Sequence, residues 1–326
     1  MLTILSLKIP SGKPTDAVDT VNHNVFSRLT DSIQFIEGRS WLEIIRLARR
    51  LRPDYALGIG SVGEILLLPF LPRKTRYGIA WHTLLRKTLA WPVRIWLFQT
   101  AHFVIAVSTC AAQTVKNFFP EKQVAVVLNG VDTDFFTPQK ANKHFLEKFG
   151  INGSKPIVLF VGALIRRKRP EIFVEVAKQH PELEFLLVGR NGDSSALADA
   201  KGLLNVHWIP NLSREEIATV MASSDIFLFP SIHEPCAAVI PEALASGLVL
   251  LASKDCGNAE LIRNGIDGIL IEQSEAEIEK FDQQLTELIK NPALKKHYSE
   301  AARKRCVETL NWDAVAKQYE KVFQSL

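Results

Sequence analysis

The feature that most constrains the fold is a regular alternation of short apolar runs and helical stretches over the second half of the chain. Runs of a few residues rich in Val, Ile, Leu and Phe have the length and composition of buried strands. Strands that alternate with helices in this way are typical of a parallel, doubly wound sheet with helices on both faces. The sequence therefore predicts an α/β domain with strands at residues 157–161, 185–188, 206–209, 226–229, 249–252 and 268–271.

The length of the chain predicts two domains, because 326 residues exceed what one hydrophobic core usually serves. The first half also alternates strands with helices, and its helix at 41–51 has the spacing of an amphipathic helix. A polar stretch with two glycines, residues 137–156, is predicted to link the domains. We expect a first domain at 1–137, a second at 138–311 and a last helix at 312–326 whose apolar residues share one face.

Two carboxylates, Glu234 and Glu242, flank the point where the predicted strand at 226–229 gives way to a helix. Ligands of open α/β sheets bind beyond the carboxyl ends of the strands. Backbone amides at such a turn can bind phosphate, and carboxylates can accept hydrogen bonds from hydroxyls. This combination favours a nucleotide-sugar site; the alternative is that both glutamates are solvated helix residues.

The two glutamates with seven residues between them, followed by Ala-Leu-Ala-Ser-Gly, resemble the E-x7-E signature of retaining GT-B glycosyltransferases. The resemblance covers residues 101–326 well and residues 1–100 weakly. It implies the GT-B fold, in which two Rossmann-like, doubly wound parallel-sheet domains face each other across a cleft and the last helix packs back on the first domain. Further motifs that resemble this family occur at residues 104–108, 129–132, 160–168, 186–190 and 209–217.

The resemblance also implies roles for the residues around the carboxylates. Glu242 would accept hydrogen bonds from the ribose hydroxyls, and Glu234 would contact the donor sugar. The backbone amides would line the sugar and the phosphates at Cys236, Ala237 and Ala238, and backbone groups at Asn211 and Leu212 would hold the base, with Arg190 as a neighbour.

Cations are expected at the leaving diphosphate, because negative charge grows there as the anomeric C–O bond breaks. Lys168 matches the lysine of the family pattern in the loop that follows Gly162. The family's arginine position is Ala163 here, so the guanidinium role is assigned to Arg167 or Arg166. Two basic side chains would do the electrostatic work of a metal, so neither a metal nor another cofactor is expected.

The first domain contributes two expected site residues. Gly12, next to Lys13, lies in the loop that approaches the donor diphosphate in the family, and His82 ends a predicted strand from which it would reach the sugar or acceptor. A structural, hydrogen-bonded role is the alternative for His82. The run at 58–63 matches G-x-G-x-x-G, but the basic residues that follow it favour close packing of strand and helix over dinucleotide binding.

The charge is unevenly distributed, because residues 1–150 carry 19 Lys and Arg against 11 Asp and Glu. A basic half indicates an anionic partner, and we expect a membrane surface at the stretch 81–96, where Trp and Arg alternate with aliphatic residues. An ordinary packed helix is the alternative there. Nucleic acid is not expected, because no aromatic-interleaved basic motif is present.

The sequence thus predicts a retaining, metal-independent transferase that moves a hexose from a UDP- or GDP-sugar to a glycan or lipid-linked acceptor. The four cysteines lack metal-like spacing, and the first residues lack the features of a signal peptide. We therefore expect a cytoplasmic protein, with peripheral attachment to the inner face of a membrane as a further hypothesis. The alternatives are a non-catalytic nucleotide-sugar-binding protein and a GT-B nucleotide-sugar epimerase.

Overall fold

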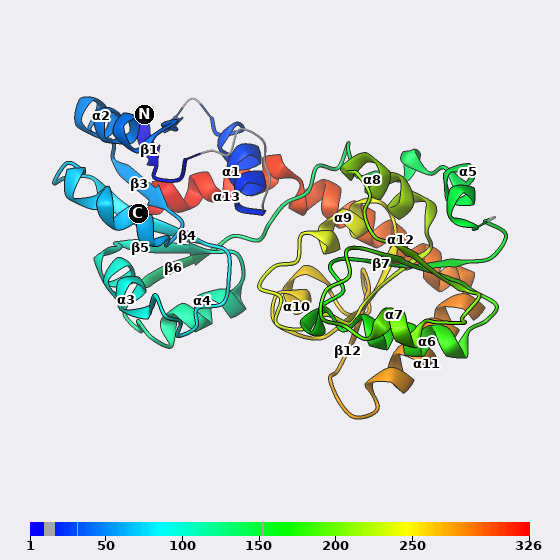
Figure 1. Cartoon of the computed structure of the whole chain (residues 1–326). Coiled ribbons are helices and arrows are strands. Elements are labelled where there is room, and N and C mark those ends of the chain that lie inside the picture. The colour runs from blue at the N-terminus through cyan, green and yellow to red at the C-terminus, as the bar shows by residue number, and fades with distance from the viewer. Residues whose placement is uncertain (10–16, 31, 152) are drawn as a thin grey trace. The chain divides into compact units, whose positions relative to one another are not determined.

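The computed structural model of the chain describes residues 1–9, 17–30, 32–151 and 153–326 (Figure 1). These divide into two compact units: unit 1 comprises Met1–Gly130 and Trp312–Leu326, and unit 2 comprises Val131–Asn311. Each unit contains one six-stranded sheet whose neighbouring strands all pair in parallel. The prediction of two Rossmann-like parallel-sheet domains is confirmed.

The sheet of unit 1 has the strand order β2-β1-β3-β4-β5-β6. Its central strands are buried apolar runs, as parallel sheets covered on both faces require. The strands are β1 (Leu2–Ser6), β2 (Ile33–Ile36), β3 (Tyr55–Gly58), β4 (Arg76–Trp81), β5 (Phe103–Ala106) and β6 (Gln123–Val126).

Helices cover both faces of this sheet. On one face, α1 packs beside α13, the C-terminal helix, which is drawn in red in Figure 1. The apolar stripe of α13, consisting of Trp312, Val315, Ala316, Tyr319 and Phe323, enters the same core as strand residues Ile4 and Phe103. The helical segments of unit 1 are α1 (Ala17–Phe26), α2 (Trp41–Leu51), η1 (Val62–Leu66), η2 (Leu68–Phe70), α3 (Trp91–Thr100), α4 (Thr109–Lys116) and α13 (Trp312–Ser325).

The sheet of unit 2 has the order β12-β11-β10-β7-β8-β9, which is the strand order of the Rossmann fold. All six strands coincide with the runs predicted from the sequence, with ends that differ by one residue at most. The strands are β7 (Ile157–Val161), β8 (Glu184–Val188), β9 (Val206–Ile209), β10 (Ile226–Phe229), β11 (Val249–Ser253) and β12 (Ile269–Ile271).

The helices of unit 2 form a layer on each side of its sheet, with α6, α7 and α11 together on one side and α8, α9 and α12 on the other (Figure 1). The α-helices are α5 (Lys143–Leu146), α6 (Pro170–Gln179), α7 (Ala196–Asp199), α8 (Arg214–Ser223), α9 (Val239–Ala245), α10 (Asn258–Leu261), α11 (Glu277–Lys290) and α12 (Pro292–Arg305). Short 3₁₀ segments are η3 (Pro138–Lys140), η4 (Glu147–Phe149) and η5 (Arg166–Lys168), and a π-helical turn, η6 (Cys306–Leu310), follows α12.

The predicted linker at 137–156 belongs to unit 2, so that prediction is wrong. Leu146 and Ile151 are fully buried, and the amide of Asn142 donates to Ser223 Oγ at 2.7 Å. The polar composition of the stretch misled because two of its few apolar residues, Leu146 and Ile151, suffice to anchor it in the core of unit 2. The chain leaves unit 1 earlier, after Gly130.

The stretch 81–96 does not form one interfacial helix either. Trp81 ends strand β4, and α3 starts only at Trp91. Trp81 and Leu85 are buried in the core of unit 1, so their apolar surface already has a protein partner. Sequence alone cannot distinguish an apolar residue that faces a core from one that faces a membrane.

The G-x-G-x-x-G run is built around the carboxylate of Glu64, which is 1% exposed. This carboxylate accepts the amides of Ile59 at 2.7 Å and Ser61 at 2.9 Å, and the Tyr77 hydroxyl at 2.6 Å. Burial and the adjacent carboxylate raise the pKa of Tyr77, which keeps the hydroxyl a donor. The amides that could bind a phosphate therefore bind an internal carboxylate, and the predicted packing role of the run is confirmed.

Replacing Glu64 by glutamine is expected to destabilise unit 1 by about 2–4 kcal/mol, because an amide NH₂ would face backbone donors in a buried site. Urea unfolding followed by tryptophan fluorescence measures this, since five of the six tryptophans lie in unit 1. The control is Glu121→Gln on an exposed loop. A Glu64→Gln midpoint equal to that of the control would contradict the expectation.

Candidate functional site

The predicted site lies in unit 2, where β7 and β10 are neighbours. The strand order reverses between these two strands, and open α/β sheets bind ligands at the carboxyl ends of strands at such a point. Arg166, Arg167 and Lys168 follow β7, and Glu234 follows β10. The sheet thus brings together residues that are far apart in the sequence.

Glycines allow two loops at this edge to approach each other. A Cβ atom at Gly189 would lie 1.9 Å from the carbonyl oxygen of Gly162, so no other residue fits there. The amide of Gly162 donates to Val188 O at 2.9 Å, and the amide of Leu164 donates to Arg190 O at 2.9 Å. These bonds fix the path of the chain into the basic turn η5.

A cluster of charges forms between the two loops. Glu234 Oε1 lies 2.7 Å from Lys168 Nζ, accepts the Ser231 hydroxyl at 2.8 Å and also accepts a hydrogen bond from Arg167 Nη1. The side chains of Lys168 and Glu234 are only 12% and 7% exposed, whereas the Arg167 side chain is 47% exposed. The structure therefore joins three of the four predicted catalytic residues, and Arg167 presents its guanidinium to solvent.

Burial and ion pairing compete in this cluster. Burial raises the pKa of Glu234, but the Lys168 ammonium, the Ser231 hydroxyl and Arg167 outweigh it, so the pKa lies below the ordinary value. Burial lowers the pKa of Lys168, and Glu234 only partly opposes this effect. Glu234 is therefore an ionised acceptor at neutral pH.

Glu242 differs from Glu234. It lies on α9, is half-buried and receives no side-chain hydrogen bond from the residues that the structure describes. Burial raises the pKa of Glu242 to about 7, and Arg214 only partly opposes this. A half-buried carboxyl group without an internal donor is suited to accept hydroxyl donors from a ligand.

The raised pKa of Glu242 predicts that the free energy of unfolding depends on pH. Between its ordinary pKa of 4.5 and about 7, the unfolded chain has lost this proton and the folded chain retains it, so stability falls as pH rises through that window. The loss is expected to reach about 3 kcal/mol at most. Urea unfolding at both ends of the window should show this slope in wild type and in an exposed control, Glu279→Gln, and not in Glu242→Gln. Equal slopes in all three proteins would contradict it.

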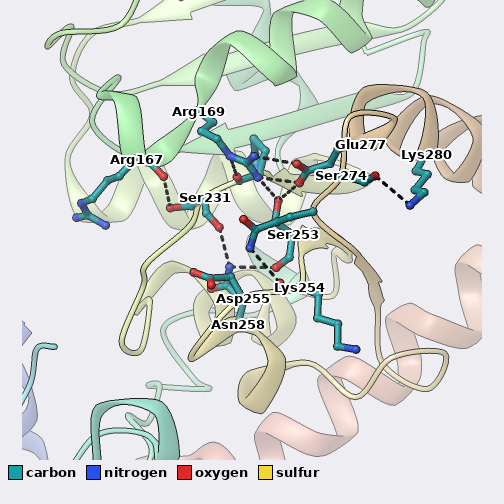
Figure 2. A network of polar contacts seen from close by, with 12 residues as sticks. Arg167, Arg169, Ser231, Ser253, Lys254, Asp255, Asn258, Ser274, Glu277 and Lys280 are labelled. Atoms are coloured by element: carbon teal, nitrogen blue, oxygen red, sulfur yellow. Dashed lines mark hydrogen bonds and ion pairs between the residues drawn. The ribbon is translucent and has the colours of Figure 1, made fainter. Parts of the chain in front are cut away.

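A second set of polar residues joins the loops on which the cluster lies (Figure 2). Arg169 forms a two-bond pair with Glu277, at 2.8 Å from Nη1 and 2.7 Å from Nη2. Its Nε donates to Pro230 O at 2.7 Å and its Nη2 to Ser253 Oγ at 2.7 Å. Arg169 thereby ties the loop after β7 to the ends of β10 and β11 and to the start of α11.

The loop that carries Glu234 is anchored on its other side as well. His233 has a left-handed backbone (φ +58°), and its amide donates to the carboxylate of Asp255. Glu234 O accepts the amide of Gly257 at 2.9 Å, and Asn258 Nδ2 donates to Ser231 O at 3.0 Å. The loop after β11 therefore determines where Glu234 points.

Sequence reasoning missed these anchoring residues. Arg169 was visible only as the last member of a basic run, and nothing in the sequence distinguishes Glu277 from the other glutamates around it. A left-handed arginine (φ +47°) between η5 and α6 is a conformation that sequence patterns do not reveal.

The other expected site residues are distributed as follows. Arg190 follows β8 and is exposed, and the amide of Arg166 donates to Asp193 Oδ1 at 2.9 Å. Gly12 lies outside the described residues, and His82 follows β4 in unit 1. Asn211 and Leu212 precede α8, while Cys236 and Ala237 are buried just ahead of α9, for which Ala238 is the N-cap.

A metal-binding cluster is not found: no group of three His, Cys, Asp or Glu residues within the described ranges could hold a metal ion. An Asp-x-Asp run occurs at 132–134, but Asp132 Oδ1 accepts the amides of Asp134 at 3.1 Å and Phe135 at 2.9 Å. That carboxylate caps a turn. Across the described parts of the chain, none of the helices has the length and apolar character to cross a membrane.

Comparison with known proteins identifies the class that this fold and site define. The family described as Glycosyl transferases group 1 matches residues 142–305, and Glycosyltransferase Family 4 matches residues 7–135. The chain belongs to the group 1 glycosyltransferases, a family with the GT-B fold.

Individual relatives are distant. The chain is 27% identical over 248 residues to alpha-maltose-1-phosphate synthase of Mycolicibacterium smegmatis, a match that covers 70% of this chain and 64% of the relative. Spore coat protein SA of Bacillus subtilis is 26% identical over 244 residues, covering 68% and 64%. The chain thus spans slightly less than two thirds of the length of these relatives.

Two solved structures match over essentially their full length. HepE of Anabaena in complex with UDP and glucose has a TM-score of 0.78 and 17% identity, with complete coverage of both chains. Sucrose-phosphate synthase from Thermosynechococcus elongatus has a TM-score of 0.75 and 18% identity, covering 100% of this chain and 99% of that one. At these identities the likeness establishes the fold.

Proposed function

We propose that the chain transfers a hexose from a UDP-sugar to an acceptor hydroxyl with retention at the anomeric carbon. The observation that carries this proposal is the Arg167–Lys168–Glu234 cluster at the point where the strand order of unit 2 reverses. Support for UDP and glucose comes from the HepE structures, which contain UDP-glucose or its two parts. A glycan or lipid-linked acceptor and a site of action at the cytoplasmic face of a membrane remain predictions from the sequence.

The chemistry follows from the charges. The bond between the anomeric carbon and the diphosphate oxygen breaks through an oxocarbenium-like state, and the diphosphate leaves with an additional negative charge. Arg167 and Lys168 would stabilise that charge in a partly desolvated site, where fixed cations are most effective. The acceptor oxygen then bonds to the anomeric carbon on the same face, and its proton passes to the leaving phosphate oxygen.

The carboxylates have different tasks in this proposal. Glu234 holds Lys168 in place and would accept a hydroxyl of the donor sugar with its remaining lone pairs. Glu242 would accept the ribose hydroxyls, which satisfies a half-buried carboxyl group that has no internal donor. The amides at Cys236, Ala237 and Ala238 would meet the sugar and phosphates, and the turn at Asn211 and Leu212 would hold the base.

A thermal-shift panel of nucleoside diphosphates and their hexose conjugates tests the donor, because a ligand that binds only the folded state raises the melting temperature. We expect UDP and UDP-glucose to give the largest shifts, and a larger shift with GDP would reassign the base. Incubation with the donor that binds, with and without acceptor sugars, then tests the reaction. A donor bound but never consumed would indicate the non-catalytic alternative, and conversion to an epimer without acceptor would indicate an epimerase.

A further inference from the structure

A basic hollow lies in unit 1, and none of the residues assigned to the proposed reaction lines it. It has a volume of about 620 Å³ and is formed by the end of α2, the segment that precedes β3, and the segment that joins η2 to β4. Because its residues precede β3 and β4, it lies at the amino ends of these strands, whereas ligands of open α/β sheets bind at the carboxyl ends. Its lining includes Arg49, Arg52, Phe70, Arg73 and Lys74.

Four of the residues that line this hollow are cations. All four are exposed, and none forms an ion pair with a carboxylate of the described chain. The one carboxylate in the lining, Asp54, accepts the amide of Thr3 at 2.7 Å. The Arg49 guanidinium lies over the Phe70 ring, 5.4 Å from its centroid. The hollow therefore has a net positive charge that no ion pair within the described residues neutralises.

Apolar side chains surround the same face. On helix α2, Ile44 and Ala48 are buried, whereas Leu42 is exposed on the same side as the arginines of this helix. Leu66, 69% exposed, and Phe70 project from η1 and η2. Basic residues attract a surface to anionic lipid headgroups, and exposed Leu and Phe side chains beside them can enter the acyl boundary.

We propose that this face, consisting of the outer side of α2, η2 and the 72–75 segment, docks on an anionic lipid bilayer. The hollow would receive the phosphate of a lipid headgroup, and Leu66 and Phe70 would enter the acyl boundary. The inference does not depend on the proposed transferase activity, because binding to lipid is measured without a donor.

Sedimentation of the full chain with vesicles tests the proposal. The protein is expected to pellet with vesicles that contain phosphatidylglycerol, to stay in the supernatant with pure phosphatidylcholine, and to be released by high salt. Each basic residue near a charged membrane contributes about 1 kcal/mol, so Arg73→Gln/Lys74→Gln should lower the partition coefficient about 30-fold. Phe70→Ser should weaken binding without abolishing its salt dependence.

The matched control is Lys296→Gln/Lys304→Gln, which removes the same charge from exposed positions of α12 in unit 2 and should bind as wild type does. Equal binding by the two double variants would overturn the proposal, as would failure of wild type to pellet. Stabilisation by inorganic phosphate without vesicle binding would identify a free-anion site instead. A dimer that is lost in Arg73→Gln/Lys74→Gln on sedimentation velocity would assign the face to a second copy of the chain.

Discussion

Replacing Lys168 by glutamine is expected to lower kcat for sugar transfer by about 10²–10³-fold, with the protein still folded. Fixed cations at a leaving group are worth this much when they act in a partly desolvated site. The glutamine can still donate to Glu234, so the buried carboxylate keeps a partner. The affinity for the intact UDP-sugar measured by calorimetry should fall less than kcat, because the diphosphate gains negative charge only as its bond to the anomeric carbon breaks.

The control for Lys168→Gln is Lys178→Gln on α6, where the side chain forms an exposed pair with Glu175. Its kcat and UDP affinity should match those of wild type. A Lys168→Gln protein with a kcat within twofold of wild type would remove Lys168 from the catalytic assignment. Loss of UDP-sugar binding in proportion to kcat would instead make Lys168 a binding residue with no special role in the transition state.

The strands of unit 2 could be predicted because a parallel sheet covered on both faces needs continuous apolar runs, which leave a strong local signal. The positions of Lys168 and Glu234 followed from the same reasoning, since a residue just after such a strand lies at its carboxyl end. Their direct contact could not be predicted, because it depends on which strands are neighbours. The pairing of β7 with β10 joins segments on either side of β8 and β9.

Other failures have the same origin. Glu64 is a single acidic residue in an apolar part of the sequence, with no local sign of its role, yet it organises the loop after β3 by accepting several donors at once. The 137–156 segment looked like a linker because only a few of its residues are apolar, yet Leu146 and Ile151 are buried in unit 2. In both cases a small number of specific contacts outweighs the local composition.

The Arg169–Glu277 pair is a contact of this specific kind that sequence patterns do not reveal, because its members are 108 positions apart. Removing one partner leaves a buried charge, so Arg169→Met alone is expected to destabilise the chain by about 3–5 kcal/mol. Replacing both by apolar residues, as in Arg169→Met/Glu277→Leu, often restores stability. The double variant would still lack the bonds to Pro230 O and Ser253 Oγ that position the loops of the cluster.

These two variants separate a positioning role from a purely structural one. If Arg169 positions the loops that carry Lys168 and Glu234, the double variant should unfold in urea near the wild-type midpoint and transfer sugar at least about tenfold more slowly, since misplacing a reacting group by about 1 Å can lower the rate 10²-fold. In the double variant, kcat should change more than KM. Arg169→Lys should recover part of the rate, because it keeps the charge and loses the two-bond geometry. A stable double variant with the wild-type kcat would show that the pair only supports the fold, and that the bonds from Asp255, Gly257 and Asn258 suffice to hold the Glu234 loop.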